Sequence, residues 1–334
     1  MKFILTADLH LSLYGNDDIN KESNLPERLH SIITSMENMI KYGIDNHIQN
    51  FVVAGDIFHN KSIIYSIAQS SLIDLVRKYK TIDFILLDGN HDMSSRTTNS
   101  ISSLKSLDSE KNVHVIHEIE QIENITFVPW KHVSKEYFSS ITSDYLISHF
   151  GVNEGKLSSG VSLVSDISSK DLSHFKFVLL GHYHANQNFT YNNTEIYYVG
   201  SPIQLDWGEK HEEKRFLVVD SKKNEIISIP TSGYKKYFEL EIKKDNVKEV
   251  LEEAKKLQEQ GEFVRLRKLE EVDTVDIQDS YHIIDDTEND ITNRGVSTTM
   301  SMEQKLLKYL EIKKIRPEDY EMYKSIGMDI VNSI

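Results

Sequence analysis

Short apolar runs that end in polar residues recur along the first 230 residues of the chain. KFILTAD at 2–8, FVVAGD at 51–56 and FILLDGNHD at 84–92 each have the pattern of a buried strand followed by a loop. Between these runs, apolar residues recur at helical spacing and predict helices over 26–47 and 66–80. Alternation of strands and helices indicates an α/β arrangement.

The following stretch is richer in strands than in helices. Further runs with strand character cover 113–116, 125–130, 144–150, 175–184, 195–201, 215–220 and 225–230. Several of them end at polar residues, and strand ends are where sites assemble in α/β folds. The order favours layers of sheet and helix over a simple doubly wound fold.

The pattern changes near residue 235. Residues 246–260 predict a charged amphipathic helix, and FVRLRKL at 263–269 fits a strand or a helix. Residues 271–290 contain eight acids and no Lys or Arg, which is typical of a solvated or disordered connector. From Met302, two short amphipathic helices separated by Pro317 follow, and they either pack back or dock onto a partner.

The composition fits a folded protein and restricts its chemistry. The chain has 334 residues, of which 39% are hydrophobic, enough to bury a core. The absence of cysteine excludes disulfides, thiolate nucleophiles and Cys-based zinc sites. No apolar run reaches the ~18 residues of a membrane span, and the N-terminal run is too short for a signal peptide. We therefore expect a soluble, cytoplasmic protein.

The charge balance is acidic. Lys and Arg number 38 and Asp and Glu 52, which gives a formal net charge of -14. Proteins that coat nucleic acid by charge alone are more often basic, so simple coating is disfavoured. A metal enzyme is still compatible with this balance, because bound cations can turn an acidic cleft into a phosphate site.

Five polar segments lie at or just past predicted strand ends. They are DLH at 8–10, GD at 55–56, GNHD at 89–92, SHF at 148–150 and GHYH at 181–184. His and Asp suit Mn, Fe and Zn, and a D-x-H or H-x-H pattern on extended chain sends both side chains to one face. Each segment alone fits a capped strand end or a turn. Their joint occurrence at strand ends predicts a metal site.

This order of segments resembles the calcineurin-like metallophosphoesterases. GDIFH at 55–59 and GSPIQL at 200–205 are similar to motifs of the nuclease branch that contains the bacterial SbcD subunit. The length, the reduced second domain and the acidic connector before a helical pair resemble the recombination endonuclease subunits of T-even-like phages, which implies host cytoplasm. Specific motifs carry the resemblance over residues 1–230. Beyond residue 235 it rests only on the order and type of the segments.

Carried over residue by residue, the resemblance implies a site for two divalent metal ions, with Mn2+ typical of this branch. The ligands would form two overlapping groups: Asp8, His10, Asp56 and His184, and Asp56, Asn90, His149 and His182. Asp56 would bridge the two ions. His91 would be the catalytic histidine that binds no metal, and Asp92 would orient it. His59 would position DNA near the site, and a loop histidine without a role is the less favoured alternative.

The resemblance also implies the domain organisation. A four-layer α/β/β/α metallophosphoesterase sandwich is expected over 1–235, followed by a small α+β cap domain at 236–270. An acidic connector would cover 271–300, and C-terminal helices at 301–334 would bind a partner. That partner is expected to be a coiled-coil ATPase of the SbcC/SMC type. A homodimer through 26–47 or 60–80 is a further expectation.

The implied function is Mn-dependent cleavage of DNA in recombination, repair or replication. The enzyme would act as an exonuclease on duplex ends and an endonuclease on single strands. One alternative is a stand-alone phosphoesterase acting on a small molecule or phosphoprotein, which fits the net charge slightly better. A scaffold with a decayed site is a third interpretation, and the complete ligand set argues against it.

Trp130 and the basic residues near it have two interpretations. Trp130 could touch a base, and Lys131, His132 and Lys135 could meet phosphate. A packed indole ring and a solvated loop are the simpler interpretation.

Overall fold

The chain forms two compact units, Met1–Lys236 and Tyr237–Ile334. The computed structural model describes residues 1–14, 18–97, 100–158, 160–162, 164–270, 272, 280–285, 301–312, 316 and 320–333. Within these ranges, every helix is too short or too polar to cross a membrane.

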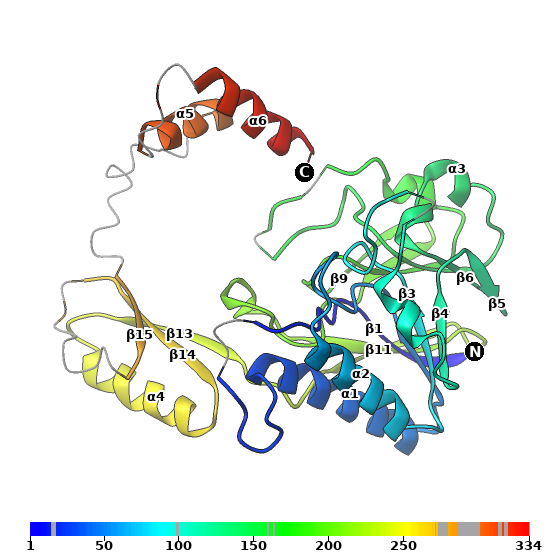
Figure 1. The fold of residues 1–334 in the computed structure, drawn as a ribbon, viewed down its shortest axis with the longest axis horizontal. Coiled ribbons are helices and arrows are strands. Elements are labelled where there is room, and N and C mark those ends of the chain that lie inside the picture. Colours follow the sequence, from blue (N-terminus) through cyan, green and yellow to red (C-terminus); the bar gives the residue numbers. More distant parts are fainter. Residues whose placement is uncertain are drawn as a thin grey trace. The chain divides into compact units, whose positions relative to one another are not determined.

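Two six-stranded sheets form the framework of the first unit (Figure 1). The first sheet has the order β12-β11-β1-β2-β3-β4. Its strands are β1 (Lys2–Thr6), β2 (Asn50–Val53), β3 (Asp83–Leu87), β4 (Val113–Ile116), β11 (Arg215–Asp220) and β12 (Glu225–Pro230). Because β1 to β4 run parallel, the loops that follow β1, β2 and β3 leave the same edge of the sheet.

The second sheet has the order β5-β6-β7-β8-β10-β9. Its strands are β5 (Glu120–Ile122), β6 (Ile125–Val128), β7 (Tyr145–His149), β8 (Phe177–Gly181), β9 (Gln187–Tyr191) and β10 (Thr194–Tyr198). The strands β6, β7, β8 and β10 are parallel, and β5 and β9 are antiparallel edge strands. The sequence pattern does not predict these two edge strands, because EQI in β5 and QNFTY in β9 contain few apolar residues.

Alternate residues of each strand pack into different layers. Ile4 contacts the cluster that includes α1 (Glu27–Asp45) and α2 (Ser66–Lys78), whereas Phe3 and Leu5 face the second sheet. Full burial of such side chains stabilises the fold by about 1.5–3 kcal/mol each. Both predicted helices are confirmed, and so is the α/β sandwich fold.

The outer face of the second sheet has a thinner cover than the first. Its apolar cluster contains Phe138 of the four-residue helix α3 (Lys135–Phe138) and Leu172 of a short 3-10 turn, with Ile167 from a loop. The sandwich is therefore layered as expected, but among the described residues of the first unit long helices cover only one of its two outer faces.

The second unit contains a small parallel sheet with the order β13-β14-β15. Helix α4 (Val247–Glu259) connects β13 (Tyr237–Ile242) to β14 (Phe263–Lys268), and its apolar face packs on both strands. The segment FVRLRKL therefore forms a strand.

Strand β15 (His282–Asp285) falls inside the stretch 271–300 that composition predicts as a connector. Its Ile283 packs with Tyr281 against the apolar cluster of this sheet, which explains why four residues of an acidic stretch join the fold. Most of the remaining connector lies outside the described residues.

Two helices close the chain, α5 (Met302–Ile312) and α6 (Tyr320–Ser333). They pack on each other: a Cβ at Gly327 would meet Leu306, and Lys324 pairs with Glu303 at 2.5 Å. Both helices were predicted from the sequence, whereas Pro317 between them lies outside the described residues.

Candidate metal centre

Polar side chains from five loops meet at one edge of the two sheets. Asp8 and His10 follow β1, Asp56 follows β2, Asn90 and His91 follow β3, His149 ends β7, and His182 and His184 follow β8. Backbone hydrogen bonds hold the first two loops together, from Asp8 N–H to the Gly55 carbonyl and from His10 N–H to the Asp56 carbonyl, both at 3.0 Å. The structure therefore brings together the segments singled out in the sequence.

Four of these residues have a strained backbone. The φ angles are 54° at Asp8, 50° at His10, 53° at Asp56 and 97° at His182. Residues with a Cβ rarely adopt positive φ, and such conformations cost about 1–3 kcal/mol each. This strain concentrates where the polar side chains gather, as is typical of functional sites.

Glycine at two positions allows the loops to approach closely. Gly55 has a φ of 87°, and a Cβ there would overlap the imidazole of His149. A Cβ at Gly89 would overlap the backbone nitrogen of Asp56. Both glycines of the sequence motifs are therefore required by the packing of the site.

One group of side chains centres on His149. Its Nδ1 donates to the Ala54 carbonyl at 2.8 Å, which turns Nε2 toward Asp56 Oδ2 at 3.2 Å and Asn90 Oδ1 at 3.0 Å. Nδ1 of His182 lies 3.1 Å from the same Asn90 oxygen. Two imidazole nitrogens, a carboxylate oxygen and an amide oxygen thus face one another.

A second group centres on His10. Its Nε2 lies 3.0 Å from Nε2 of His184 and 3.7 Å from Asp56 Oδ2. One ligand atom each from Asp8, His10 and His184 falls within a mutual distance of 4.8 Å, as does one each from Asp8, Asp56 and His149. The Asp56 carboxylate therefore lies between the two groups.

The charges of the site call for cations. Asp8 and Asp56 are buried, at 0% and 2% exposed. Burial lowers the pKa of His10, and it lowers the pKa of His182 to about 3, so both imidazoles are neutral and able to ligate. Burial opposes protonation of His149 as well, but the charge of Asp56 raises its pKa to about 9.

Two buried carboxylates thus face one another, burial raises the pKa of Asp8, and the charge of Asp56 draws a proton onto His149. Uncompensated buried charge is costly, and divalent cations relieve it with the same nitrogen and oxygen atoms as ligands. The residues present fit divalent metal ions.

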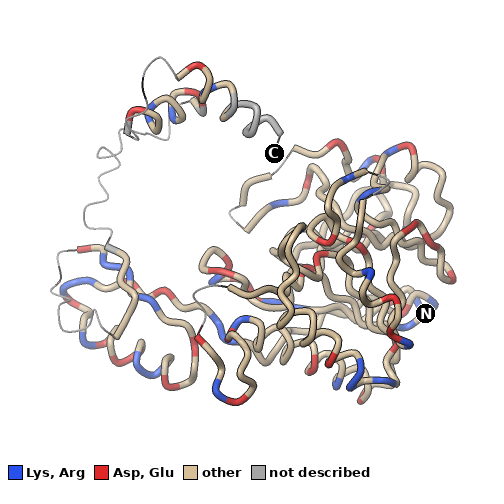
Figure 2. The backbone as a smooth tube through the Cα atoms, viewed as in Figure 1, with Lys and Arg blue, Asp and Glu red and all other residues tan. Residues whose placement is uncertain are grey.

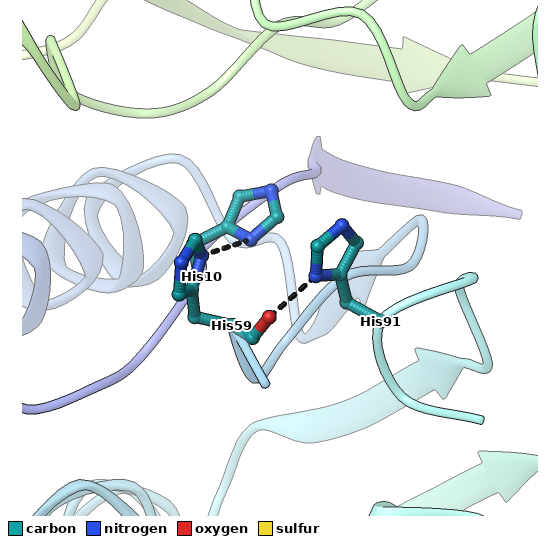
Figure 3. Close-up of side chains that lie close together, drawn as sticks. All are labelled: His10, His59 and His91. Carbon is teal, nitrogen blue, oxygen red and sulfur yellow. Dashed lines mark hydrogen bonds between the residues drawn. The ribbon is translucent and has the colours of Figure 1, made fainter. Parts of the chain in front are cut away.

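His91 and His59 lie beside the second group (Figure 3). His91 Nδ1 donates to the backbone carbonyl of His59, and its backbone N–H donates to Asp56 Oδ1 at 2.8 Å. The rings of His59 and His91 stack with centroids 5.7 Å apart, and Nδ1 of His59 lies 3.2 Å from Nδ1 of His10. The carbonyl of His59 therefore fixes the orientation of the His91 ring.

Asp92 has a different position from the one expected. Its buried carboxylate accepts the backbone N–H groups of Ile57 at 3.1 Å, Phe58 at 2.9 Å and Gly89 at 3.0 Å. Within the described part of the chain, no hydrogen bond joins it to the imidazole of His91. Asp92 ties two loops of the site together, and the orienting contact to His91 comes from His59 instead.

Glu209 and Lys214 belong to the site, although the sequence motifs did not indicate them. Glu209 Oε1 lies 2.9 Å from His184 Nδ1, and its Oε2 accepts from Leu205 N–H at 2.9 Å and Lys214 Nζ at 2.7 Å. Burial would raise the pKa of Glu209, but the bond to His184 and the charge of Lys214 lower it to about 2. The loop that begins with GSPIQL therefore holds His184 in place.

Replacing Glu209 with Gln should weaken metal binding about 10–100-fold, because partners that orient a ligating histidine have effects of this size. Calorimetric titration of Mn2+ into metal-depleted protein measures this change. Glu213→Gln, in the same loop and exposed, is the matched control and should bind as the unmodified protein does. Equal affinities of the two variants would show that Glu209 does not position His184.

A cavity of about 420 Å³ adjoins the site. It is lined by Leu157, Ser158, His182, His184, Asp206, Gly208 and Glu209. Its size is within the usual range for small-molecule sites, which is about 300–1,000 Å³.

Comparisons with known proteins identify a family for most of the first unit. Residues 1–186 match the family described as calcineurin-like phosphoesterase. Over 127 residues the chain is 25% identical to the SbcD subunit of the SbcCD nuclease of Staphylococcus epidermidis, a match that covers 36% of this chain and 33% of that protein. The chain thus spans about a third of the length of this relative.

Two solved structures were also matched at low identity. An archaeal phosphodiesterase is 11% identical with a TM-score of 0.36, over 69% of this chain and 99% of the other. A dimetal phosphatase from Danio rerio is 13% identical with a TM-score of 0.45, over 70% and 96% of the two chains.

Proposed function

The chain belongs to the calcineurin-like phosphoesterase family, and from this premise we propose that it is a manganese-dependent DNA nuclease. The family uses a dimetal centre, and the protein is a metal-dependent hydrolase of phosphoester bonds. The proposal concerns its substrate. The protein would degrade DNA duplexes from their ends as an exonuclease and would cut single strands as an endonuclease.

The position of His59 carries the proposal. His59 is partly exposed and lies against both His10, which is buried, and His91. A strand whose phosphate reaches the metal centre would therefore pass over His59. The similarity to a protein named as a nuclease subunit supports the same substrate class.

The seven ligand residues would hold two cations in two groups that share Asp56. Cations bound there would lower the pKa of a water molecule and neutralise charge on the phosphoryl oxygens. His91 is held at Nδ1 by the His59 carbonyl, so its protonated ring can donate from Nε2 to the leaving oxygen. Such general acid catalysis contributes about 10²–10⁴-fold.

Three substrates test the proposal with Mn2+: a linear duplex, a circular single strand and a nitrophenyl phosphodiester. We expect degradation of the duplex from its ends, cutting of the circle and turnover of the small diester. Turnover of the small diester with both DNA substrates intact would contradict the nuclease proposal.

Replacing His59 with Ala should lower DNA cleavage about 10–100-fold, because a strand that is slightly misplaced reacts that much more slowly. Hydrolysis of the nitrophenyl diester should change little, since this substrate does not need the strand contact. Initial rates on both substrates measure the difference. His114→Ala, which removes an exposed histidine from β4, is the control. An equal loss on both substrates would place His59 in the chemistry instead.

We also propose that the α5–α6 pair docks onto a coiled-coil ATPase of the SbcC/SMC type. Tyr309, Met322 and Tyr323 are exposed on these helices, and aromatic residues and Met are enriched at interfaces. The name of the relative describes it as one subunit of a complex, which supports a partner. We also propose a homodimer through 26–47 or 60–80.

Removal of 301–334 should abolish binding to the ATPase and leave hydrolysis of the nitrophenyl diester unchanged. The ligand residues all precede this segment, so the metal centre is not expected to depend on it. Co-purification of the tagged ATPase with the full and shortened chains measures the effect. Retention of the ATPase by the shortened chain would rule out this docking site.

A stand-alone phosphoesterase is the second candidate. Acidic and basic residues are interspersed along the backbone of the described parts (Figure 2), and the net charge is -14. The cavity beside His182 and His184 would accommodate a small phosphoester. This candidate predicts a higher catalytic efficiency on small phosphoesters than on any DNA.

A further inference from the structure

A group of basic and aromatic side chains lies outside the metal centre, around Trp130. Lys61 Nζ lies 5.7 Å and Arg96 Cζ 5.4 Å from the centroid of the indole ring, both in cation–π geometry. The three residues come from the loops after β2, β3 and β6. We call them the Trp130 cluster.

The Trp130 cluster adjoins the catalytic loops. The backbone N–H of Trp130 donates to the carbonyl of Asp88 at 3.0 Å, next to Gly89 of the motif that carries His91. Lys61 is two residues beyond His59 in the chain. A strand that passes over His59 would therefore meet these side chains next.

The positive charges of Lys61 and Arg96 are held in place but not neutralised. Arg96 Nη2 donates to the Val133 carbonyl at 2.9 Å, and the ring of Trp130 fixes both cations further. Both side chains are exposed, and within the described ranges neither pairs with a carboxylate. Lys131, by contrast, pairs with Glu118 at 2.6 Å.

The lack of acidic partners at Lys61 and Arg96, in the part of the chain that the structure describes, indicates an anionic ligand. In a chain with a net charge of -14, two neighbouring cations without acidic partners create a local positive field next to the reaction site. The side chains of Lys61 and Arg96, held beside one aromatic ring, suit successive phosphates of a strand. A single small phosphoester would instead bind at the metal centre alone.

We propose that Lys61, Arg96 and Trp130 bind the backbone of a single DNA strand beside the cleaved phosphate. This inference rests on the proposed nuclease function and adds a specific strand site to it. The two cations neutralise phosphates, and the partly exposed indole ring keeps them together. Binding is therefore independent of base sequence.

The test compares two double variants of the full chain. Lys61→Gln/Arg96→Gln removes the cations of the cluster. Lys80→Gln/Lys111→Gln is the control, because these exposed lysines precede β3 and β4 and so lie at the opposite ends of the strands. Both variants lose two positive charges. Both are made in the His91→Asn background, so that a fluorescent oligo(dT) strand is bound with Mn2+ but not cut.

Fluorescence anisotropy between 50 and 200 mM NaCl gives the dissociation constant and its salt dependence. The cluster variant should bind about tenfold more weakly, and the slope of log K against log salt should fall by about 1.4, or about 0.7 for each phosphate contact. The control should match the parent protein. Binding should also quench protein fluorescence, and the quenching should be smaller with Trp130→Phe, which leaves Trp207 as the other tryptophan.

Three results separate the possible failures. Unchanged affinity and slope in the cluster variant, or no strand binding by the parent, would overturn the inference. A cluster variant with active His91 should still hydrolyse the nitrophenyl diester, and loss of that activity would also overturn the inference. Weakened binding in the cluster variant with no DNA cleavage by the unmodified protein would support the strand site and contradict the nuclease function.

Discussion

Replacing Asp56 with Ala should abolish metal binding and phosphodiester hydrolysis together. The Asp56 carboxylate lies 3.2 Å from His149 Nε2 and 3.7 Å from His10 Nε2, so it is placed to serve both ligand groups. Its Oδ1 also accepts the backbone N–H of His91 at 2.8 Å. Metal ions supply several kcal/mol of charge stabilisation, so we expect a loss of about 10⁴-fold or more.

Metal content and thermal stability measure this effect alongside the rate. Mn2+ should raise the melting temperature of the unmodified protein, because a ligand that binds only the folded state stabilises it. The Asp56→Ala variant should show no such rise. Asp56→Asn keeps the shape and tests for misfolding, and Asp83→Asn, at the exposed start of β3, is the control. A variant with two bound metals, or with about 1% of the normal rate or more, would contradict the bridging role.

Replacing His91 with Ala should abolish DNA cleavage while the metal ions stay bound. His91 is held by the carbonyl of His59 and the carboxylate of Asp56, but it belongs to neither ligand group. Loss of a general acid costs about 10²–10⁴-fold. The loss should be larger on DNA than on the nitrophenyl diester, because an alkoxide needs a proton to leave and a nitrophenolate does not.

Rates on both substrates and the metal content of the purified variant test this role. His91→Asn keeps a polar side chain and should behave in the same way, and His114→Ala serves as the control. Loss of metal in His91→Ala would make His91 a ligand. An equal loss on both substrates would mean that His91 stabilises charge rather than donates a proton.

Much of the fold follows from local patterns. The apolar run at Phe51 ends at Gly55 and Asp56, and the structure has β2 followed by a tight loop there. Apolar residues at helical spacing predicted α1 and α2 to within two residues at each end. Because the carboxyl ends of parallel strands share an edge, the polar residues after β1, β2 and β3 meet without further information.

The contacts that orient the site could not be predicted in the same way. Glu209 is one of several acids in the stretch 206–213, and no local pattern marks it as the one that reaches His184. The bond from His91 to the carbonyl of His59 joins two loops through the backbone, which leaves no trace in residue type. Such contacts depend on how the loops pack in three dimensions.

A crystal grown with Mn2+ and measured at the manganese absorption edge tests the central claim most directly. The structure predicts two anomalous peaks about 3.5–4 Å apart, with the Asp56 carboxylate between them. One should lie against His10 and His184, and the other against His149 and His182. A single peak among His10, His59 and His91, whose nitrogens also lie within 4.8 Å of one another, would contradict the two-metal site.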